Sequence, residues 1–397
     1  MRFPEVPAAA VGRRVVYVDP AAAAPGTGTR EAPFVGVEQA LAAAGEDGWV
    51  VLASGEHRAN LIVTGRRHLL GVCAARTRVV GAPTAAVIVA RGPGASVHLE
   101  GLALEGGLHG AGSELGGVLN ARRVRAQGAV RRGLYAEGAL SRAEVVDSVA
   151  TRCGINGLPA LAGGSLTATR VSSFANVNLG AGADGRDSQL VLTDVAIVGT
   201  SLLPDGTSGA GIVVQGGSSV HAERVAIDRN RSFGVSVVGA STGRITDVFI
   251  RDTGADALGQ FGQSLRADNG SSLTGTRVTT LRAHVGGVVA TAKGSILRLT
   301  ECVVRDSLGT LIDGQPHEGI GAAAALGGLV VLERCAIERN LSIGAAATMG
   351  GHIEVRDSIV ADTRVPMRPM APIGSVGVNV IDGSTGVVER VRISGQR

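Results

Sequence analysis

The sequence predicts an all-β protein, a single parallel β-helix built as a solenoid of about 14 stacked coils. Two observations carry this prediction. A repeat of 21 to 26 residues runs from about Val97 onward, and later in the chain every second coil carries extra residues at the same point. A repeat of this size is too small to bury its own apolar face, so its copies must stack on one another.

The repeat has one recurring segment, apolar-x-x-x-x-apolar-x-apolar, as in Val220 to Ile227. Apolar residues two apart along a strand face the same side, so this spacing predicts strands with one face in the core. The second apolar position, or its equivalent, falls at Leu102, Val124, Val145, Val171, Val195, Val225, Val248, Val278, Cys302, Cys335, Ser358 and Val391.

The composition restricts the function. There are 60 glycines without a Gly-X-Y period, which excludes collagen, and hydrophobic residues make up 45% of the chain, enough for a long core. The net charge is only +4 and acidic residues are interspersed with basic ones, so we expect no nucleic-acid partner. No apolar run is long enough for a membrane span.

The four cysteines show no zinc-binding spacing, so we expect no metal and no other cofactor. Cys302 and Cys335 occupy the same repeat position in consecutive coils and should lie about 4.8 Å apart. That distance does not exclude a disulfide. Stacked parallel side chains point the same way, however, so two reduced core thiols are favoured.

Residues 1–14 are expected to form a flexible tail, and residues 15–63 an N-terminal cap with the first coil. Within the cap, Val15–Val18 predicts a short strand and Phe34–Ala44 a short amphipathic helix. A helix of this kind would hide the first strand edge. Residues 64–397 would be coils of the same single domain.

The cap sequence YVDP…PGTGTREAPFVGVEQALAAAGEDGWVVLASGEHRANLIV resembles the opening of right-handed parallel β-helix proteins of the pectate-lyase-like superfamily. Such proteins often begin with a strand, a GT…P turn and a capping helix. The resemblance implies right-handed coils and, with the body of the chain, a bacterial protein of the cell exterior. It implies fold more specifically than function, because this fold carries lyases, hydrolases, epimerases, adhesins and inert spacers.

The first residues contain no segment that resembles a signal peptide. Either the protein is cytoplasmic or an export signal has been removed, and the fold type favours the second. We therefore expect an extracellular or cell-surface location.

Charged residues follow the two-coil period. After the anchor positions, consecutive coils read Asp228-Arg229, Arg251-Asp252, Leu281-Arg282, Arg305-Asp306, Glu338-Arg339 and Ala361-Asp362. In register, these would form columns of alternating Arg and Asp that oppose a one-coil slip. Asn follows at 230 and 340, where we expect a tight left-handed turn, and Thr or Ser where an insertion opens.

Four insertions leave the coils at one corner and should line one flank: residues 201–211, 254–270, 308–321 and 364–375. Insertions on a rigid scaffold are where function is usually found. They supply our candidate binding residues, which are Asp205, Asp256, Phe261, Arg364, Met367, Arg368 and Met370. Aspartates of the first three insertions could offer oxygens to calcium, although no calcium motif is present.

The third insertion contains Gln315-Pro316-His317-Glu318, similar to the DPHE signature of mannuronan C5-epimerases. The resemblance implies His317 as a proton-transfer residue, and we take Glu318 and Asp313 as its catalytic companions. Gln315 stands where that family has an aspartate, and the only tyrosines are Tyr17 and Tyr135.

Other enzyme signatures of this fold are incomplete. Arg364-Val-Pro-Met-Arg368 is one residue short of the pectate-lyase RxPxxR motif. Of the polygalacturonase contexts, there is only His109-Gly110 and no Asp-Asp pair.

The sequence therefore favours a secreted or surface-anchored, non-catalytic β-helix. It would bind a polysaccharide or a cell-surface protein along its loop-bearing flank, or serve as a rigid spacer. The alternative is a carbohydrate-active enzyme, a lyase, epimerase or hydrolase, that acts on acidic polysaccharide. The last coil has no cap sequence, so an end-to-end contact through it is also expected.

Overall fold

The computed structural model describes residues 3–309, 311–312, 315–316, 319–364 and 375–396. Its contacts divide the chain into two compact units. Unit 1 comprises residues 1–176 and 187–190, and unit 2 comprises residues 177–186 and 191–397. The expectation of one continuous domain stays a prediction, and each unit is described by itself.

Unit 1 begins with the cap. β1 (Val15–Val18) pairs in parallel with β2 (Gly48–Leu52), and α1 (Val37–Ala44) turns its small buried residues toward these strands. Residues 3–14, expected to be a flexible tail, contribute to the cap's packing. Phe3 is 9% exposed and meets Tyr17 edge-on at 5.0 Å, while Ala10 packs with Trp49.

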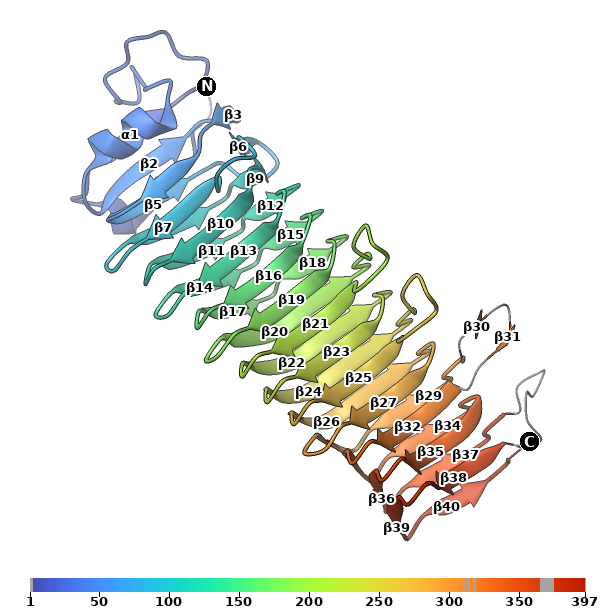
Figure 1. Cartoon of the computed structure of the whole chain (residues 1–397). Helices are drawn as coiled ribbons and strands as arrows, with labels where there is room; N and C mark the ends of the chain where they lie inside the picture. Colours follow the sequence, from blue (N-terminus) through green and yellow to red (C-terminus); the bar gives the residue numbers. More distant parts are fainter. Residues whose placement is uncertain (1–2, 310, 313–314, 317–318, 365–374, 397) are drawn as a thin grey trace. The chain divides into compact units, whose positions relative to one another are not determined.

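The coils of unit 1 each contribute one strand to three parallel sheets (Figure 1). The first sheet contains β2, β5 (Arg66–Leu70), β8 (Ser96–Glu100), β11 (Val118–Arg122), β14 (Arg142–Val146) and β17 (Ser165–Thr169). The second contains β3 (Gly55–Arg58), β6 (Thr77–Gly81), β9 (Ala103–Gly106), β12 (Arg125–Gln127), β15 (Val149–Thr151) and β18 (Ser172–Phe174). The third contains β4 (Leu61–Val63), β7 (Ile88–Arg91), β10 (His109–Glu114), β13 (Arg132–Glu137) and β16 (Asn156–Leu161).

In unit 2 the third sheet consists of β19 (Leu179–Asp184), β21 (Ala210–Gln215), β23 (Phe233–Val238), β25 (Gln263–Asp268), β27 (Gly286–Thr291), β32 (Gly319–Ala325), β35 (Ser342–Thr348) and β38 (Val376–Val380). The first and second sheets are joined in the long strands β20 (Gln189–Val198), whose first two residues belong to unit 1, β22 (Ser219–Asp228), β24 (Thr242–Arg251) and β26 (Ser272–Leu281).

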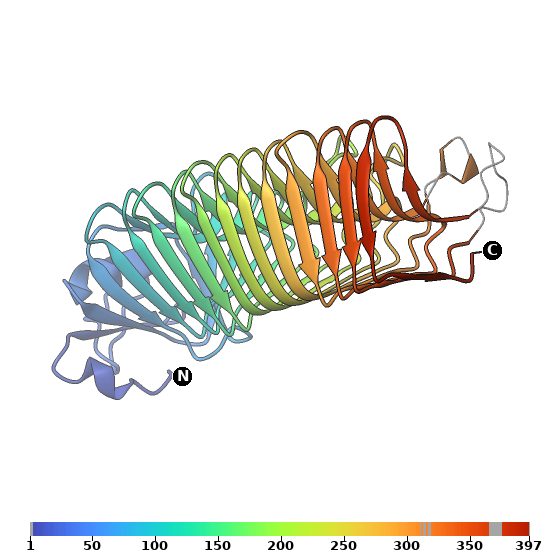
Figure 2. The same ribbon diagram turned by 90° about the horizontal axis from the view of Figure 1, so that it is seen from below.

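Further along unit 2 the two sheets have separate strands. These are the pairs β28 (Ile296–Thr300) and β29 (Val303–Arg305), β33 (Leu329–Glu333) and β34 (Ala336–Glu338), β36 (His352–Arg356) and β37 (Ile359–Ala361), and β39 (Thr385–Glu389) and β40 (Arg392–Ser394). β30 (Leu311–Ile312) and β31 (Gln315–Pro316) form a small antiparallel pair in the third insertion. Figure 2 shows how the strands of each coil stack on those of the next within a unit. No helix in the described parts of the chain is long and apolar enough to cross a membrane.

The strand register tests the predicted repeat. In unit 2, Val225 of β22 is in register with Val248 of β24, and the same column continues through Val278 and Cys302. One of the predicted repeat positions in unit 1 is wrong. Arg125 is opposite Val149, so the residue equivalent to Val124 is Ser148 and not Val145. Ser148 escaped detection because it is polar; its hydroxyl accepts a hydrogen bond from the Val124 N–H at 3.0 Å.

The predicted charge columns are confirmed in unit 2. Arg251 pairs with Asp228 at 2.9 Å, Arg282 with Asp252 at 2.5 Å and Arg339 with Asp306 at 2.7 Å. Each arginine reaches the aspartate of the preceding coil with two nitrogens. Such bidentate pairs fix the geometry of neighbouring coils as well as neutralising charge.

The expectation for the asparagines needs a correction. The left-handed residue is the one before each asparagine, as Arg229 shows with a φ of 52°. Asn230 itself is 1% exposed, accepts from the Thr200 N–H at 2.8 Å and donates to the Ile197 carbonyl at 3.3 Å. Asn340 makes the same contacts with the coil that opens the third insertion. The asparagine amide thus replaces backbone pairing where an insertion leaves the coil.

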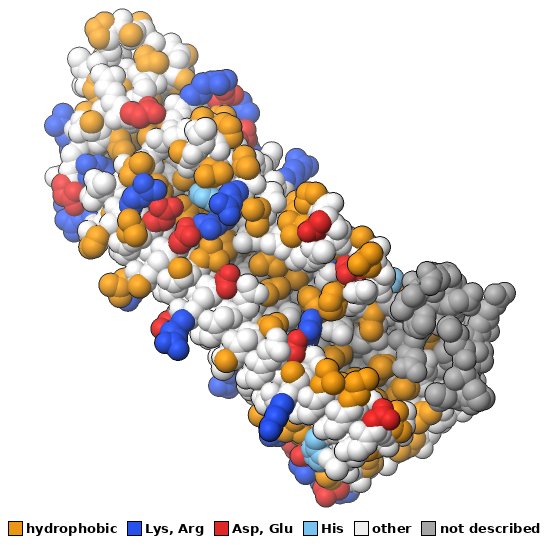
Figure 3. All heavy atoms as spheres, viewed as in Figure 1, with side chains coloured by type: hydrophobic (Ala, Val, Ile, Leu, Met, Phe, Trp, Pro, Cys, Tyr) orange, Lys and Arg blue, Asp and Glu red, His pale blue; other side chains and the backbone are white. Residues whose placement is uncertain are grey.

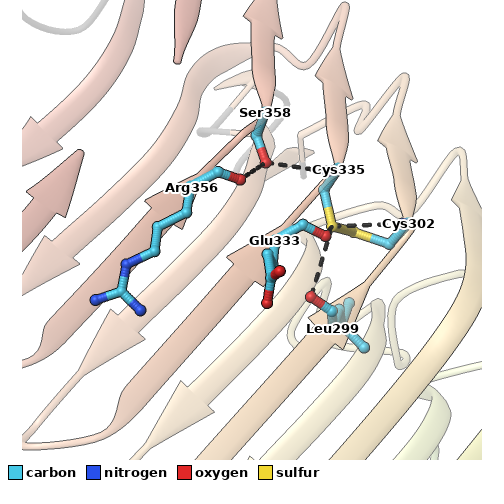
Figure 4. Close-up of a disulfide and its surroundings, with 6 residues drawn as sticks. All are labelled: Leu299, Cys302, Glu333, Cys335, Arg356 and Ser358. Carbon is cyan, nitrogen blue, oxygen red and sulfur yellow. Dashed lines mark hydrogen bonds between the residues drawn. A yellow bond between two sulfur atoms is a disulfide. The ribbon is translucent and has the colours of Figure 1, made fainter. Parts of the chain in front are cut away.

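The prediction of two reduced thiols is also wrong. Cys302 and Cys335 form a disulfide, with Cα atoms 4.5 Å apart (Figure 4). Both lie in the core next to the corner where first and second sheets meet, and Ser358 takes the next position in the column, where its hydroxyl accepts from the Cys335 N–H at 2.9 Å. The Cα separation is within the range of disulfides, so the parallel stacking direction did not prevent the bond.

Candidate functional site

The insertions predicted at 201–211 and 254–270 are shorter than expected, because Ala210 begins β21 and Gln263–Asp268 form β25. Residues 201–209 and 254–262 lie on one flank of unit 2, at the edge where the chain enters the third sheet (Figure 1). They touch each other, because the Ala257 N–H donates to the Gly206 carbonyl at 3.0 Å. Their aspartates stabilise turns. Asp205 accepts from the Thr207 N–H at 2.9 Å, and Asp256, which is 6% exposed, accepts from two backbone N–H groups. These carboxylates are therefore used by the loops themselves.

Phe261 belongs to a cluster at the outer face of the third sheet of unit 2, which we call the aromatic cluster: Phe233, Phe261, Gln263 and Arg266. The two rings are 5.1 Å apart, and the Arg266 guanidinium lies 5.0 Å from the Phe233 ring and 5.6 Å from the Phe261 ring. Phe261 remains 38% exposed. Arg266 also pairs with Asp268, which is 7% exposed.

Two polar atoms of the aromatic cluster are unsatisfied. The Nε atom of Arg266 and the Oε1 atom of Gln263 are buried and have no hydrogen-bond partner among the described residues. Buried polar groups are rarely left in this state, because an unmade hydrogen bond costs free energy. An exposed ring beside an unpartnered donor and an unpartnered acceptor is suited to a ligand with an apolar face and hydroxyl groups.

The outer face of the third sheet in unit 1 carries a second group of polar side chains. Tyr135 lies across Gly112 of the preceding coil, where a Cβ would be 2.2 Å from the ring, and is fully buried. Its hydroxyl donates to Glu114 at 2.5 Å, and Glu114 also pairs with Arg91 at 2.7 Å. In the same view as Figure 1, Figure 3 shows basic and acidic side chains close together on this part of unit 1.

His109 and Arg132 complete this group. They are opposite each other on neighbouring strands, and the His109 ring lies 5.0 Å from that of Tyr135. Arg132 pairs with Glu137 at 2.5 Å. His109 is 8% exposed, and its Nδ1 atom has no partner among the described residues.

Burial sets the protonation of this group. It lowers the pKa of His109 to about 4, helped by the charges of Arg132 and Arg131, so the imidazole is neutral near pH 7. Burial also raises the pKa of Tyr135, which keeps its proton. For Glu114, burial acts in the opposite direction to the hydrogen bonds from Tyr135 and Arg91, and the net result is a lowered pKa.

Unit 1 also has a cavity of about 270 Å³ between α1 and β4. It is lined by Glu38, Leu41, Ala42, Asn60, Leu61, Ile62, Val63, Thr64 and Arg67. The Asn60 amide is used by the 82–86 turn and Arg67 pairs with Glu46, so few free polar groups face this cavity.

The other predicted site residues are placed as follows. Arg364 is exposed and lies 3.6 Å from Asp306 through its guanidinium. The candidates that lie outside the described residues are Asp313, His317, Glu318, Met367, Arg368 and Met370. In the described ranges no group of three or more His, Cys, Asp or Glu side chains is placed to hold a metal ion.

No family model matches the chain, and no curated protein does. Among solved structures, the catalytic domain of a GH87 alpha-1,3-glucanase in complex with nigerose is similar over 97% of this chain and 70% of its own, with 11% identity and a TM-score of 0.54. The A-module of the mannuronan C-5 epimerase AlgE4 from Azotobacter vinelandii matches over 95% of this chain and 97% of its own, with 16% identity and a TM-score of 0.46. The pectate lyase Pel9A matches over 73% of this chain and 75% of its own, with 14% identity and a TM-score of 0.44.

The chain thus has a right-handed parallel β-helix fold, which it shares with the glucanase domain. At these identities the likeness concerns the fold and does not carry a substrate to this chain.

Proposed function

We propose that this protein is an extracellular, non-catalytic β-helix that binds a polysaccharide at the aromatic cluster of unit 2. The observation that carries the proposal is the 38% exposed ring of Phe261 beside Arg266 and Gln263, whose buried Nε and Oε1 atoms have no hydrogen-bond partner among the described residues. A sugar ring can stack on the exposed phenyl face, and its hydroxyls can reach Arg266 and Gln263 once these side chains turn outward.

Two further findings support the proposal. The glucanase with the same fold was solved with the disaccharide nigerose, so such a scaffold can hold a sugar. The Cys302–Cys335 disulfide fits an oxidising compartment, as expected of a secreted protein, because cytosolic thiols are usually kept reduced.

Phe261→Ala tests the binding site, and Phe249→Ala is its matched control. Phe249 is also 38% exposed and also lies near an arginine, Arg251, at 5.9 Å, but it sits on the second sheet of unit 2. Losing a stacked ring should weaken binding to the retained polysaccharide about ten-fold, since such a contact contributes roughly 1–1.5 kcal/mol. The control variant should bind as the parent protein does.

The measurement is affinity electrophoresis of the folded variants against a panel of neutral and acidic polysaccharides, followed by calorimetry with the best ligand. Equal losses in both variants, or none in Phe261→Ala, would refute the proposed site. If no polysaccharide is retained at all, a cell-surface protein partner or a spacer role replaces the proposal.

The second candidate function is a carbohydrate-active enzyme, favoured by the fold shared with the glucanase. Chromatography of each polysaccharide after incubation separates it from simple binding. An enzyme releases products or changes the sugar composition, and His317→Ala should abolish that turnover if the third insertion carries the chemistry. Turnover lost in this way would overturn the non-catalytic reading.

A further inference from the structure

We propose that the cavity between α1 and β4 in unit 1 is a docking site for an extended peptide segment of another protein, one that carries a basic side chain. The segment adds a strand to the free edge of β4 and places its basic side chain beside Glu38, which lines the same cavity. The proposal goes beyond polysaccharide binding and uses no residue of the aromatic cluster in unit 2.

The edge of β4 has backbone groups that are free to pair. β4 is the last strand of the third sheet on this side, and its described partner is β7 alone. The Leu61 N–H donates to the Val87 carbonyl at 2.8 Å, so the backbone groups of Leu61 and Val63 point toward β7. The N–H and the carbonyl of Ile62 therefore point to the other edge, where no described residue bonds to them. Such an edge can pair with a strand of another chain.

The space beside this edge is open. The cavity of about 270 Å³ lies between β4 and α1, and all three residues of β4 line it. The Ile62 side chain is 55% exposed, whereas Leu61 and Val63 are each 2% exposed and face the core. The volume is slightly below the ~300 Å³ at which small-ligand pockets begin, so the cavity suits a short stretch of an extended chain.

The charges in the lining indicate the chemistry of the partner. Arg67 is engaged, because its Nη1 atom pairs with Glu46 at 3.3 Å and its Nε atom donates to the Leu41 carbonyl at 3.3 Å. Glu38 is exposed and has no ion pair or side-chain hydrogen bond with the described residues. Its carboxylate is complementary to a lysine or arginine side chain, and the apolar parts of Leu41 and Ile62 can cover the stem of that side chain.

An extended peptide is the class of ligand that uses all of these features. Its backbone offers an N–H and a carbonyl at the spacing of a strand, which is how peptides add to exposed sheet edges. A sugar hydroxyl could bond to the Ile62 backbone but would bring no positive charge to Glu38. A small anion would be repelled by the same carboxylate.

The main test measures fluorescence anisotropy with a labelled five-residue peptide of alternating threonine and valine around a central lysine. Two further peptides replace the lysine by norleucine or by glutamate. Glu38→Gln should weaken binding of the lysine peptide about three-fold or more, as expected for an exposed ion pair, and should leave the norleucine peptide unaffected. Glu31→Gln is the matched control, because Glu31 is also an exposed acid of the cap but does not line the cavity. The control should bind as the parent protein does.

A second pair of variants tests the strand edge. Ile62→Pro removes the free N–H and keeps the bond between Leu61 and Val87, since proline is tolerated at the open side of an edge strand. It should weaken peptide binding about ten-fold, whereas Ile62→Val, which keeps the N–H, should bind normally. A lysine peptide with N-methyl groups on alternate amides tests the same contact on the parent protein, so the result does not depend on the folding of Ile62→Pro.

Three outcomes would overturn the proposal: no binding of the lysine peptide at millimolar concentration, equal affinity for the lysine and glutamate peptides, or equal affinity for the methylated and unmethylated peptides. Sedimentation of the protein alone distinguishes the source of the strand. A dimer that Ile62→Pro dissociates would make the occupant a second copy of this chain and would refute the assignment to another protein. Phe261→Ala should bind every peptide as the parent does, so the two proposed sites are tested separately.

Discussion

Single residues at the corners of the coils combine an unusual backbone conformation with charge. In unit 2, Asp247 has a φ of 54° and Arg277 of the next coil a φ of 52°, and their side chains pair at 2.6 Å. In unit 1, Asp147 and Arg170 do the same, also at 2.6 Å. A left-handed residue with a side chain costs about 1–2 kcal/mol. The bidentate pair offsets part of this cost and links one coil to the next.

His109 gives a prediction at this scale. Its folded pKa of about 4 lies below the ordinary value of about 6.5, so the unfolded chain binds the proton more readily. The contribution of His109 to the free energy of unfolding is therefore fully present above about pH 6.5 and falls as the pH is lowered toward 4. Below about pH 4 this group causes no further change in stability. The imidazole should titrate near pH 4 by NMR, whereas a midpoint near 6.5 would contradict the burial of the ring.

His109→Gln isolates the effect on stability. In urea unfolding of the parent protein, His109 should account for a loss on the order of 2 kcal/mol between pH 6.5 and 4. The variant should lack this component, although its carboxylates still titrate at lower pH.

The sequence could predict which residues face the core, because the repeat determines them. It could predict little of the side-chain contacts between one coil and the next. Val225 and its column could be predicted because apolar spacing alone places them in the core. Tyr135 could not, because its place depends on Gly112 of the preceding coil leaving room for a ring. The one misplaced anchor, Val145 for Ser148, made this harder, since the correct register is needed to set His109 opposite Arg132.

At the level of the elements, the insertions are attached in different ways. The first is held by Asn230 from the following coil, through the N–H of Thr200. The second follows Thr253, and Ala283 takes the asparagine position of the next coil, so no amide can act there. Its turn depends instead on Asp256 and on the contact between Ala257 and Gly206. The sequence predicted the alternation of Asn with Thr or Ser, but only the structure shows the amide bridging two coils.

The disulfide between two neighbouring coils leads to a prediction about the number of free thiols. It joins Cys302, just before β29, to Cys335, just before β34, and so closes the coil that contains the third insertion. Cys73 and Cys153 are free. We expect two titratable thiols per denatured, unreduced chain, because the other two sulfurs are bonded to each other. Four thiols would contradict the disulfide.

Its contribution to stability can be measured in the same protein. The double variant Cys302→Ala, Cys335→Ala should lose about 2–4 kcal/mol in the free energy of unfolding, as is typical when a disulfide is removed. Reduced parent protein serves as the control for the side-chain volume that the alanines remove. The sequence placed both cysteines in one column, but stacking direction alone could not decide whether they bond.

For the whole molecule, the fold and the chemistry have different origins. Apolar spacing and the cap sequence were enough to predict a right-handed parallel β-helix, because the same requirement recurs in every coil. Binding chemistry does not recur. The aromatic cluster combines Phe261 of an insertion with Phe233 and Arg266 of two different strands, and only the register brings them together. Phe261 alone was identified in advance, as the one aromatic residue of the four insertions.

The Asp–Arg pairs give a prediction for the molecule as a whole. Hydrogen bonds from arginines of the next coil lower the pKa of Asp147 in unit 1 and of Asp247, Asp252, Asp306 and Asp357 in unit 2. A carboxylate with a lowered folded pKa stabilises the protein above its unfolded pKa of about 4. That stabilisation is lost as the pH falls through the folded value, so the urea midpoint should drop steeply below about pH 4.

The variant Asp252→Asn, Arg282→Gln removes both charges of one pair, and Thr300→Ala serves as a control on the first sheet of the same unit. The double variant should be less stable at pH 7, because the ionic form of the pair is lost, and should lose less stability than the parent between pH 5 and 3. The control should keep the parental acid dependence. An unchanged difference between pH 5 and 3 in the double variant would mean that the pairs do not contribute to stability, and that backbone pairing alone fixes the register of the coils.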